Sequence, residues 1–266
     1  MTPSKSRSAP FAKRRLLLLL DCVMLHSNEK ADGSGLFMKI IIGNRTYSSW
    51  SLRGWLAAKQ SLLPFETELR VMDSPEWISG EAKADMPSGK VPVLWDHGEA
   101  IWDSMAILMY LADKAGHDRF WPRDMHALGL AYAMCAEMHS GFAPLRSACP
   151  MDLQHHAPGF VASPEVLADV RRLETLWEEA LTRFGEETGE PWLFGRFGAA
   201  DIMFAPTCTR INTYHLPVSD RVRAYIDRVL AHPFMAEWTA EAMKEDFPFT
   251  RYPISGKIRI TAETRA

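Results

Sequence analysis

Hydrophobic and polar positions follow two different periods along the chain. Residues 39–43, Lys-Ile-Ile-Ile-Gly, form a continuous apolar run that is typical of a buried strand, and residues 65–71 alternate as a second strand does. Between them, over residues 50–60, apolar side chains recur at helical spacing. Strand, helix and strand over so short a stretch predict a βαβ unit with a right-handed crossover.

A hairpin and a helix complete this half of the pattern. Residues 91–95 and 100–102 are predicted as short strands joined by a polar turn. Asp103 and Ser104 then begin a helix that ends at Gly116. The order βαβ followed by ββα predicts an α/β layer built on one mixed sheet.

From about residue 125 onward the pattern is helical, and no strand pattern reappears. The expected helices cover residues 125–147, 164–185, 200–214, 219–231 and 233–244. We therefore expect an α/β plus all-α protein, in which an α/β domain precedes an all-helical domain. The expected boundaries are 38–118 for the first domain, 125–248 for the second and 249–266 for a C-terminal tail.

The first 37 residues differ in pattern from the rest. Three basic residues at 13–15 precede the leucine run 16–20, as in a signal peptide, but Asp21 ends the run and no A-x-A site follows. The run is also too short to span a bilayer. Because Met38 opens the first clear strand, we hypothesise that residues 1–37 are a disordered extension or a mis-assigned start.

Composition narrows the range of partners. With 30 basic and 33 acidic residues the net charge is −3, too weak a field to attract nucleic acid or an anionic membrane. A small molecule is the better expectation. The four cysteines lie far apart without CxxC spacing, as in reduced cytoplasmic proteins, and the nine histidines form no HExxH motif, so we expect no metal site.

Two serines, Ser48 and Ser49, lie between the first predicted strand and its helix. A helix N-terminus offers unpaired N–H groups and the positive end of the dipole, which together suit an anion such as a thiolate. A serine hydroxyl can add one charge-assisted hydrogen bond. Serine is also favoured as a simple helix cap, and the local sequence leaves both interpretations open.

Two further motifs carry weaker signals. In the segment Gly89–Pro92, a cis Val91–Pro92 bond would turn the Val91 backbone outward to pair with a peptide, whereas a trans proline at a strand edge is the commoner case. Asp103 and Ser104 would cap the next helix, or hold the ammonium and carboxylate groups of a ligand. We expect all three motifs at one edge of the sheet.

Three segments stand in a specific order along the first half of the chain: Tyr47-Ser-Ser-Trp-Ser-Leu-Arg53, Ser88-Gly-Lys-Val-Pro-Val-Leu94 and Ile101-Trp-Asp-Ser-Met-Ala-Ile-Leu-Met-Tyr-Leu111. Together they resemble the glutathione-binding domain of glutathione S-transferases, and the resemblance extends over about residues 38–244. It implies a thioredoxin-like N-terminal domain followed by an all-helical C-terminal domain. It also implies glutathione as co-substrate, a homodimer and a cytoplasmic location.

The resemblance implies that a hydroxyl at the first helix start activates the glutathione thiol. Ser48 is the first candidate, Ser49 the second and Tyr47 the third. The backbone before the proline would pair with the cysteinyl unit, and the acidic–serine pair would hold the γ-glutamyl end. The residues so implied in glutathione binding are Trp50, Lys90, Val91, Pro92, Asp103 and Ser104.

The serine motif is most similar to that of the zeta class, which implies maleylacetoacetate isomerisation, but Trp50 stands where that class has a small thiol residue. We therefore expect the glutathione thiolate to be transferred to a small hydrophobic electrophile. Glutathione-dependent cis–trans isomerisation and glutathione binding without catalysis are the alternatives.

The electrophile's pocket is expected between the serine loop and the first long helix of the second domain. Met138, Phe142 and Arg146 are spaced four apart there and are the expected lining, with Arg146 attracting an acidic electrophile; the alternative is a methionine and aromatic core stripe. The resemblance further implies that Asp201 bonds back to the backbone of Gly198 at a later helix start.

Overall fold

A four-stranded mixed sheet forms the first part of the chain, as the sequence predicts. The computed structural model describes residues 38–185, 191–247 and 256–261, so the expected extension at 1–37 and part of the expected tail lie outside the described residues. The strands lie in the order β2-β1-β3-β4. Their bounds are Met38–Ile42 for β1, Phe65–Leu69 for β2, Val93–Asp96 for β3 and Glu99–Ile101 for β4.

The directions of the strands bring three chain segments to one edge of this sheet. β1 is parallel to β2 and antiparallel to β3, and β3 is antiparallel to β4. β1 and β4 therefore end at the edge where β3 begins, with Ile41 opposite Val93 and Leu94 opposite Ile101. The helices that follow β1 and β4 must start at that edge, next to the Val91–Pro92 segment.

Helices occupy most of the remaining described residues. The α-helices begin and end as follows: α2 Ser49–Ser61, α3 Pro75–Ser79, α4 Ser104–Ala115, α5 Met125–Ser140, α6 Ala143–Ala148, α7 Pro164–Ala180, α8 Ala199–Thr213, α9 Asp220–Ala231 and α10 Pro233–Ala242. Short 3₁₀ turns lie at Glu81–Lys83 and His117–Arg119, and a π-helical turn at Leu181–Gly185 extends α7. No helix among the described residues is long and apolar enough to cross a membrane.

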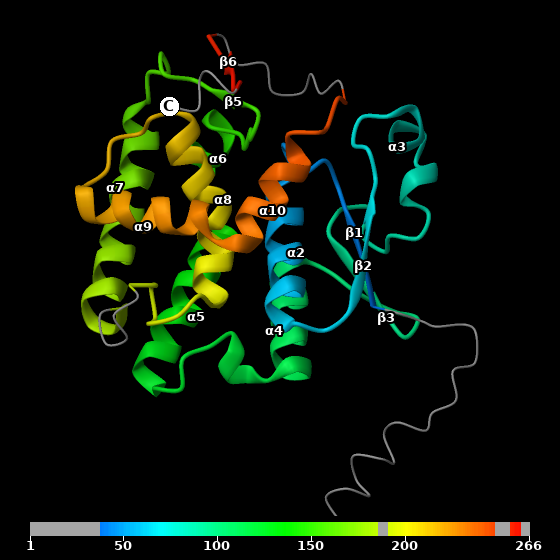
Figure 1. Cartoon of the computed structure of the whole chain (residues 1–266), viewed down its shortest axis with the longest axis horizontal. Coiled ribbons are helices and arrows are strands. Elements are labelled where there is room, and N and C mark those ends of the chain that lie inside the picture. The colour runs from blue at the N-terminus through cyan, green and yellow to red at the C-terminus, as the bar shows by residue number, and fades with distance from the viewer. Residues whose placement is uncertain (1–37, 186–190, 248–255, 262–266) are drawn as a thin grey trace, which may run out of the picture. The chain divides into compact units, whose positions relative to one another are not determined.

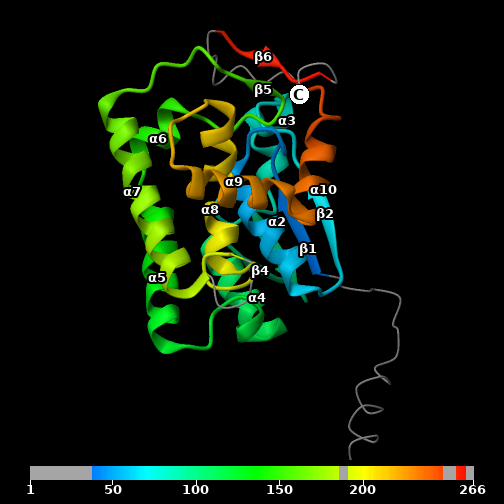
Figure 2. The ribbon, with the colours of Figure 1, turned by 60° about the vertical axis from the view of Figure 1, so that its left-hand side comes forward.

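Helix α2 joins the α/β part to the helical part. It packs against α4 and the sheet on one side and against α8 and α10 on the other, and Figures 1 and 2 show it standing between the two parts. Leu52 and Leu56 of α2 are fully buried together with Ile40 and Ile42 of β1. On the opposite face of the sheet, Trp77 of α3 packs against a smaller cluster. One main core therefore runs through both parts.

Two features of the helical part differ from the sequence expectation. The helix predicted over 125–147 is broken between α5 and α6, because Phe142 adopts a left-handed conformation with φ of 58°. Strands also reappear: β5 (His155–His156) pairs antiparallel with β6 (Ile258–Arg259), so the expectation of helices alone after residue 125 was wrong. Two-residue strands carry too little alternation to be seen in a sequence.

The start of α8 depends on a buried carboxylate. Asp201 accepts hydrogen bonds from the backbone N–H of Gly198 at 2.9 Å, from that of Leu193 at 3.4 Å and from the Tyr225 hydroxyl at 3.0 Å. Glycine is required at the helix cap because a Cβ at position 198 would lie 2.6 Å from the Phe120 carbonyl oxygen. The backward bond expected of Asp201 is thereby confirmed, and the absence of a capping serine has a steric cause.

We predict that Asp201→Asn removes a pH dependence of stability. Burial raises the pKa of Asp201 from 3.8 to about 7. Between pH 3.8 and about pH 7 the Asp201 carboxyl is protonated in the folded chain and ionised in the unfolded chain. Its contribution to the stability of the folded state is therefore largest below about pH 4 and is lost as the pH rises to about 7.

Urea unfolding of both proteins between pH 5 and pH 7 tests this. One pKa unit corresponds to about 1.4 kcal/mol, so the unfolding free energy of the wild type should fall by about 2–3 kcal/mol more than that of the variant. Parallel pH profiles, or a wild type that gains stability relative to the variant, would contradict the prediction.

Candidate functional site

The two serines at the start of α2 have different hydrogen-bond partners. Ser48 is the N-cap; its hydroxyl donates to the Ser51 hydroxyl at 2.7 Å and accepts from the Ser51 N–H at 3.4 Å. The Ser51 hydroxyl oxygen in turn accepts from the Gly43 N–H at 2.9 Å. The Ser48 hydroxyl proton therefore takes part in a hydrogen bond within the loop, which agrees with the interpretation of Ser48 as a helix cap.

The Ser49 hydroxyl is held by the helical part. Its oxygen accepts from the Arg210 guanidinium of α8 at 3.1 Å, and its backbone carbonyl accepts from Arg53 at 3.4 Å. A hydroxyl whose oxygen accepts from a cation is a better donor of its own proton. The Ser49 hydroxyl thus accepts from a cation, whereas the Ser48 hydroxyl donates within the loop.

Tyr47, the third candidate, has an unfavourable environment for this role. Burial, followed by the charges of Asp152 and Glu245, raises the pKa of its hydroxyl to about 12. These two carboxylates belong to the segment before α7 and the segment after α10. Tyr47 is therefore a weaker proton donor than an ordinary tyrosine.

Trp50 lies close to two guanidinium groups. The Arg53 guanidinium lies 4.5 Å from the centre of its ring and the Arg146 guanidinium 4.7 Å. Burial, then the charges of Arg210 and Arg146, lowers the pKa of Arg53, and burial lowers that of Arg146. Within the described residues neither Arg53 nor Arg146 forms an ion pair with a carboxylate. The site therefore has an excess of positive charge.

The start of α4 connects to the same group. Asp103 caps the helix, accepting from the Met105 N–H at 2.9 Å, and its other carboxylate oxygen lies 2.6 Å from Nε2 of His139. The His139 ring is 5.2 Å from that of Trp50. Beside Asp103, the Ser104 hydroxyl is buried and has no partner among the described residues. The structure thus brings the serine motif and the acidic–serine motif together through His139.

The Val91–Pro92 segment packs against α2. The peptide bond between these residues is cis, which the sequence hypothesis required; the Trp102–Asp103 bond is cis as well. Pro92 lies so close to Gly54 that a Cβ on this glycine would be 2.8 Å from the proline ring. Val91 is half-buried and Lys90 is exposed at the edge.

The three residues expected to line the electrophile pocket lie in different surroundings. Met138 is fully buried in the main core, with its sulfur 3.2 Å from the Thr207 hydroxyl, and Phe142 is 6% exposed. The backbone reversal at Phe142 ends α5, so these side chains do not continue one open helical face. The core-stripe interpretation thus describes Met138 and Phe142, while Arg146 remains half-buried beside Trp50.

The described residues contain no group of three or more His, Cys, Asp and Glu side chains arranged to hold a metal. Three described cysteines, Cys135, Cys149 and Cys208, are buried free thiols. Burial raises the pKa of Cys149 to about 12 and raises those of the other two as well. These three thiols are therefore protonated at neutral pH and are poor nucleophiles.

Two family models match the chain at these elements. Residues 47–114 match the model described as "Glutathione S-transferase, N-terminal domain", and residues 161–241 match "Glutathione S-transferase, C-terminal domain". Together they cover more than half of the chain and include both serines, the Val91–Pro92 segment, the start of α4 and Arg210.

The chain belongs to the glutathione S-transferase family.

Individual members of this family are distant from the chain. Mouse glutathione S-transferase theta-1 is 31% identical over 120 residues, which are 43% of this chain and 49% of the mouse protein. The match thus spans about half the length of that relative.

Solved structures with the glutathione S-transferase fold extend the comparison. Glutathione S-transferase unclassified 2 from Bombyx mori has a TM-score of 0.61 at 20% identity, with 78% of this chain and 94% of that chain covered. The yeast protein Ure2p in complex with glutathione has a TM-score of 0.56 at 18% identity, covering 83% and 98%. These likenesses confirm the expected fold, a thioredoxin-like domain followed by a helical domain.

Three residues of the site were not identified by sequence reasoning. Arg210 lies 161 positions from the serine that it contacts, and nothing in its local sequence distinguishes it from a surface arginine. His139 lies outside every motif. Ser51 belongs to the family motif, and its position three residues after Ser48 is the one sign that it would face the cap.

Proposed function

We propose that this chain binds glutathione at the sheet edge and transfers its thiolate to a small electrophile. One observation carries the proposal: two helix N-termini and the Val91 backbone meet at this edge, where the buried Ser104 hydroxyl has no partner in the described part of the chain. In the proposed pose, Asp103 and Ser104 hold the γ-glutamyl end, Val91 pairs with the cysteinyl backbone and the sulfur faces Ser49. The thioredoxin-like fold of the family supports this arrangement.

Four contributions around the start of α2 favour the thiolate. A free thiol titrates near pH ~8.5, and lowering that value by about two units requires roughly 2.7 kcal/mol of differential stabilisation. The Ser49 hydroxyl donates one hydrogen bond, the helix dipole adds a partial positive charge, and the guanidinium groups of Arg53 and Arg210 add full charges nearby. The sum is of the required size.

The reaction itself needs little else from the protein. The thiolate attacks the electrophilic carbon, a C–S bond forms, and the leaving group departs with the bonding electron pair. Holding the two reactants together supplies the remaining rate enhancement. Trp50 offers an apolar surface for a hydrophobic acceptor, and Arg146 offers a cation for one with an acid group.

We predict that Ser49→Ala lowers kcat/KM with glutathione and 1-chloro-2,4-dinitrobenzene by at least about tenfold at pH 6.5, because a hydrogen bond to a charged group is lost. The loss should shrink at pH 9, where the thiol ionises unaided.

Ser48→Ala is the matched control, and its kinetic effect should be smaller at both pH values. A larger loss in the Ser48 variant would exchange the roles of the serines. Retention of the wild type on glutathione resin without turnover on a panel that includes maleylacetone would support non-catalytic binding, whereas turnover of maleylacetone alone would support the isomerase.

We predict that Arg146 selects acidic acceptors. Arg146→Gln should lower kcat/KM for 4-chloro-3,5-dinitrobenzoate by about tenfold, since an ion pair in a half-buried site is lost. For the neutral 1-chloro-2,4-dinitrobenzene, kcat/KM should change by less than about twofold. Arg171→Gln, on the exposed face of α7, controls for the loss of a positive charge. Equal losses on both acceptors would mean that Arg146 only supports Trp50.

We also propose that the chain forms a homodimer through exposed apolar side chains on α4, on α5 and just before α4. Met109 of α4, Tyr132 of α5 and Trp102 before α4 are 52%, 42% and 46% exposed, and the Tyr132 hydroxyl lies 3.1 Å from Nε2 of His117 just after α4. Exposed large apolar groups mark protein interfaces where they form one patch. Sedimentation velocity should give twice the chain mass for the wild type and the monomer for Met109→Lys. Val161→Lys, at an 88% exposed position, should remain dimeric.

A further inference from the structure

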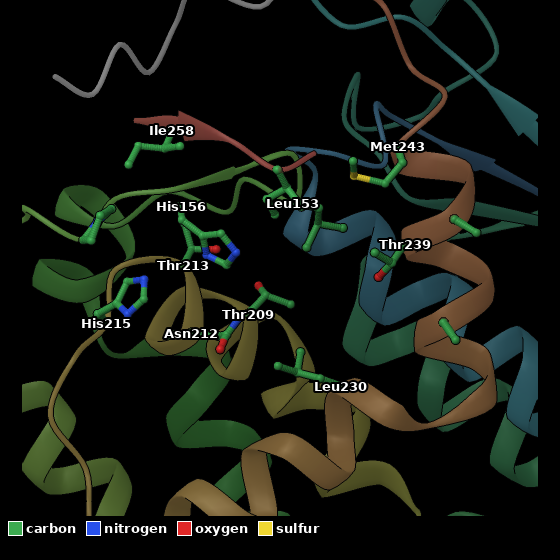
Figure 3. A pocket seen from close by; sticks show the side chains of 14 residues that line it. Leu153, His156, Thr209, Asn212, Thr213, His215, Leu230, Thr239, Met243 and Ile258 are labelled. Atoms are coloured by element: carbon green, nitrogen blue, oxygen red, sulfur yellow. The ribbon is translucent and has the colours of Figure 1, made fainter. Parts of the chain in front are cut away.

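A second cavity lies away from the serine loop, between α8, α10 and the β5–β6 pair. Its volume is about 800 Å³, which falls within the ~300–1,000 Å³ of typical small-molecule sites. Figure 3 shows Thr209 and Thr213 of α8 on one side of the cavity. Thr239 of α10 and Met243, which follows α10, lie on the other side. None of the residues assigned above to the glutathione and electrophile sites lines this cavity.

The lining is apolar with a few uncharged polar groups. Leu153, Leu230, Met243, Ile258 and Ile260 supply aliphatic surface, together with two alanines of α10. Two histidines, three threonines and an asparagine complete it, and no lysine, arginine, aspartate or glutamate is among the lining residues. An ion placed here would lose its hydration without gaining a counter-charge. The cavity therefore selects for an uncharged molecule.

Most hydroxyl groups of the lining already have partners. Thr209 donates to the Pro206 carbonyl at 2.8 Å, and Thr213 donates to the Asp152 carbonyl at 3.1 Å. In contrast, no hydrogen bond joins the half-buried His156 side chain to a described residue; its Nδ1 is buried, and the centre of its ring lies 5.6 Å from that of His215. A ligand in the cavity can supply the hydrogen bond that the described residues do not give this ring.

The protonation state of His156 narrows the ligand's polar group. Burial, then the proximity of His215, lowers the pKa of His156, so the ring is neutral at pH 7. Each ring nitrogen donates in one tautomer and accepts in the other. A hydroxyl group suits both tautomers because it can accept or donate, whereas a carboxylate can only accept.

We propose that this cavity is a second binding site, for an uncharged, mainly apolar molecule that carries one hydroxyl group and bonds to the His156 ring. The site is separate from the one that holds glutathione, and the two can be occupied together. The expected ligands are phenols, aryl alcohols and alkyl alcohols of about the size of two fused rings.

Calorimetric titration of the full chain with 2-naphthol tests the proposal, with 2-naphthoate and naphthalene as charged and hydroxyl-free counterparts. 2-Naphthol should bind at least about fivefold more tightly than either, since each counterpart loses the hydrogen bond or introduces a buried charge. Equal affinity for 2-naphthoate would overturn the proposed selectivity.

Variants locate the site. Ala240→Phe fills the cavity from an exposed position on α10 and should abolish 2-naphthol binding, whereas Ala168→Phe, at an exposed position on α7 outside the cavity, should not change it. His156→Phe keeps a ring and should weaken binding of 2-naphthol roughly fivefold while leaving that of naphthalene unchanged. Retained 2-naphthol binding in Ala240→Phe would overturn the assignment, and so would equal weakening of both compounds in His156→Phe.

Discussion

Two buried guanidinium groups hold the serine loop against α8, and the chemistry available at that loop depends on them. Arg53, inside α2, donates from Nε to the Met203 carbonyl at 2.8 Å, and Arg210 donates to the Ser49 hydroxyl at 3.1 Å. Taking a cation out of water is costly unless hydrogen bonds and a counter-charge replace its hydration. Here carbonyl and hydroxyl oxygens provide the hydrogen bonds, while no carboxylate among the described residues pairs with Arg53. An anion bound nearby would supply the missing charge.

The lowered pKa of Arg53 expresses the same cost in another form. A guanidinium group keeps its proton in proteins. The lowered pKa of Arg53 therefore indicates surroundings that are unfavourable for a cation. Trp50 relieves part of this cost, because its ring attracts the cations of Arg53 and Arg146, which lie 4.5 and 4.7 Å from its centre. A large aromatic residue at this position of the motif therefore stabilises two neighbouring cations that repel each other.

The sequence predicts the α/β part well because its signals are local. The predicted helix over 50–60 corresponds to α2, since Ser48 provides a cap that can be recognised without knowing the fold. The shared sheet edge also follows from the sequence, because a βαβ unit and a hairpin fix the strand directions. What the sequence does not reveal depends on distant contacts. The contact between Ser49 and Arg210 depends on the packing of α8 on α2, so no local pattern in the sequence predicts it.

The helical part also determines the shape of the loop that leads into the serines. Glu245, just after α10, accepts from the backbone N–H groups of Arg45 and Thr46 at 2.7 and 3.0 Å, and Trp238 of α10 donates to the Arg45 carbonyl at 3.0 Å. The loop therefore cannot move independently of α10. Because α8 and α10 also form walls of the second cavity, the serine hydroxyls and that cavity share their supporting helices. A shift of α10 would change the backbone that presents Ser49, so the position of one helix links the geometry of both sites.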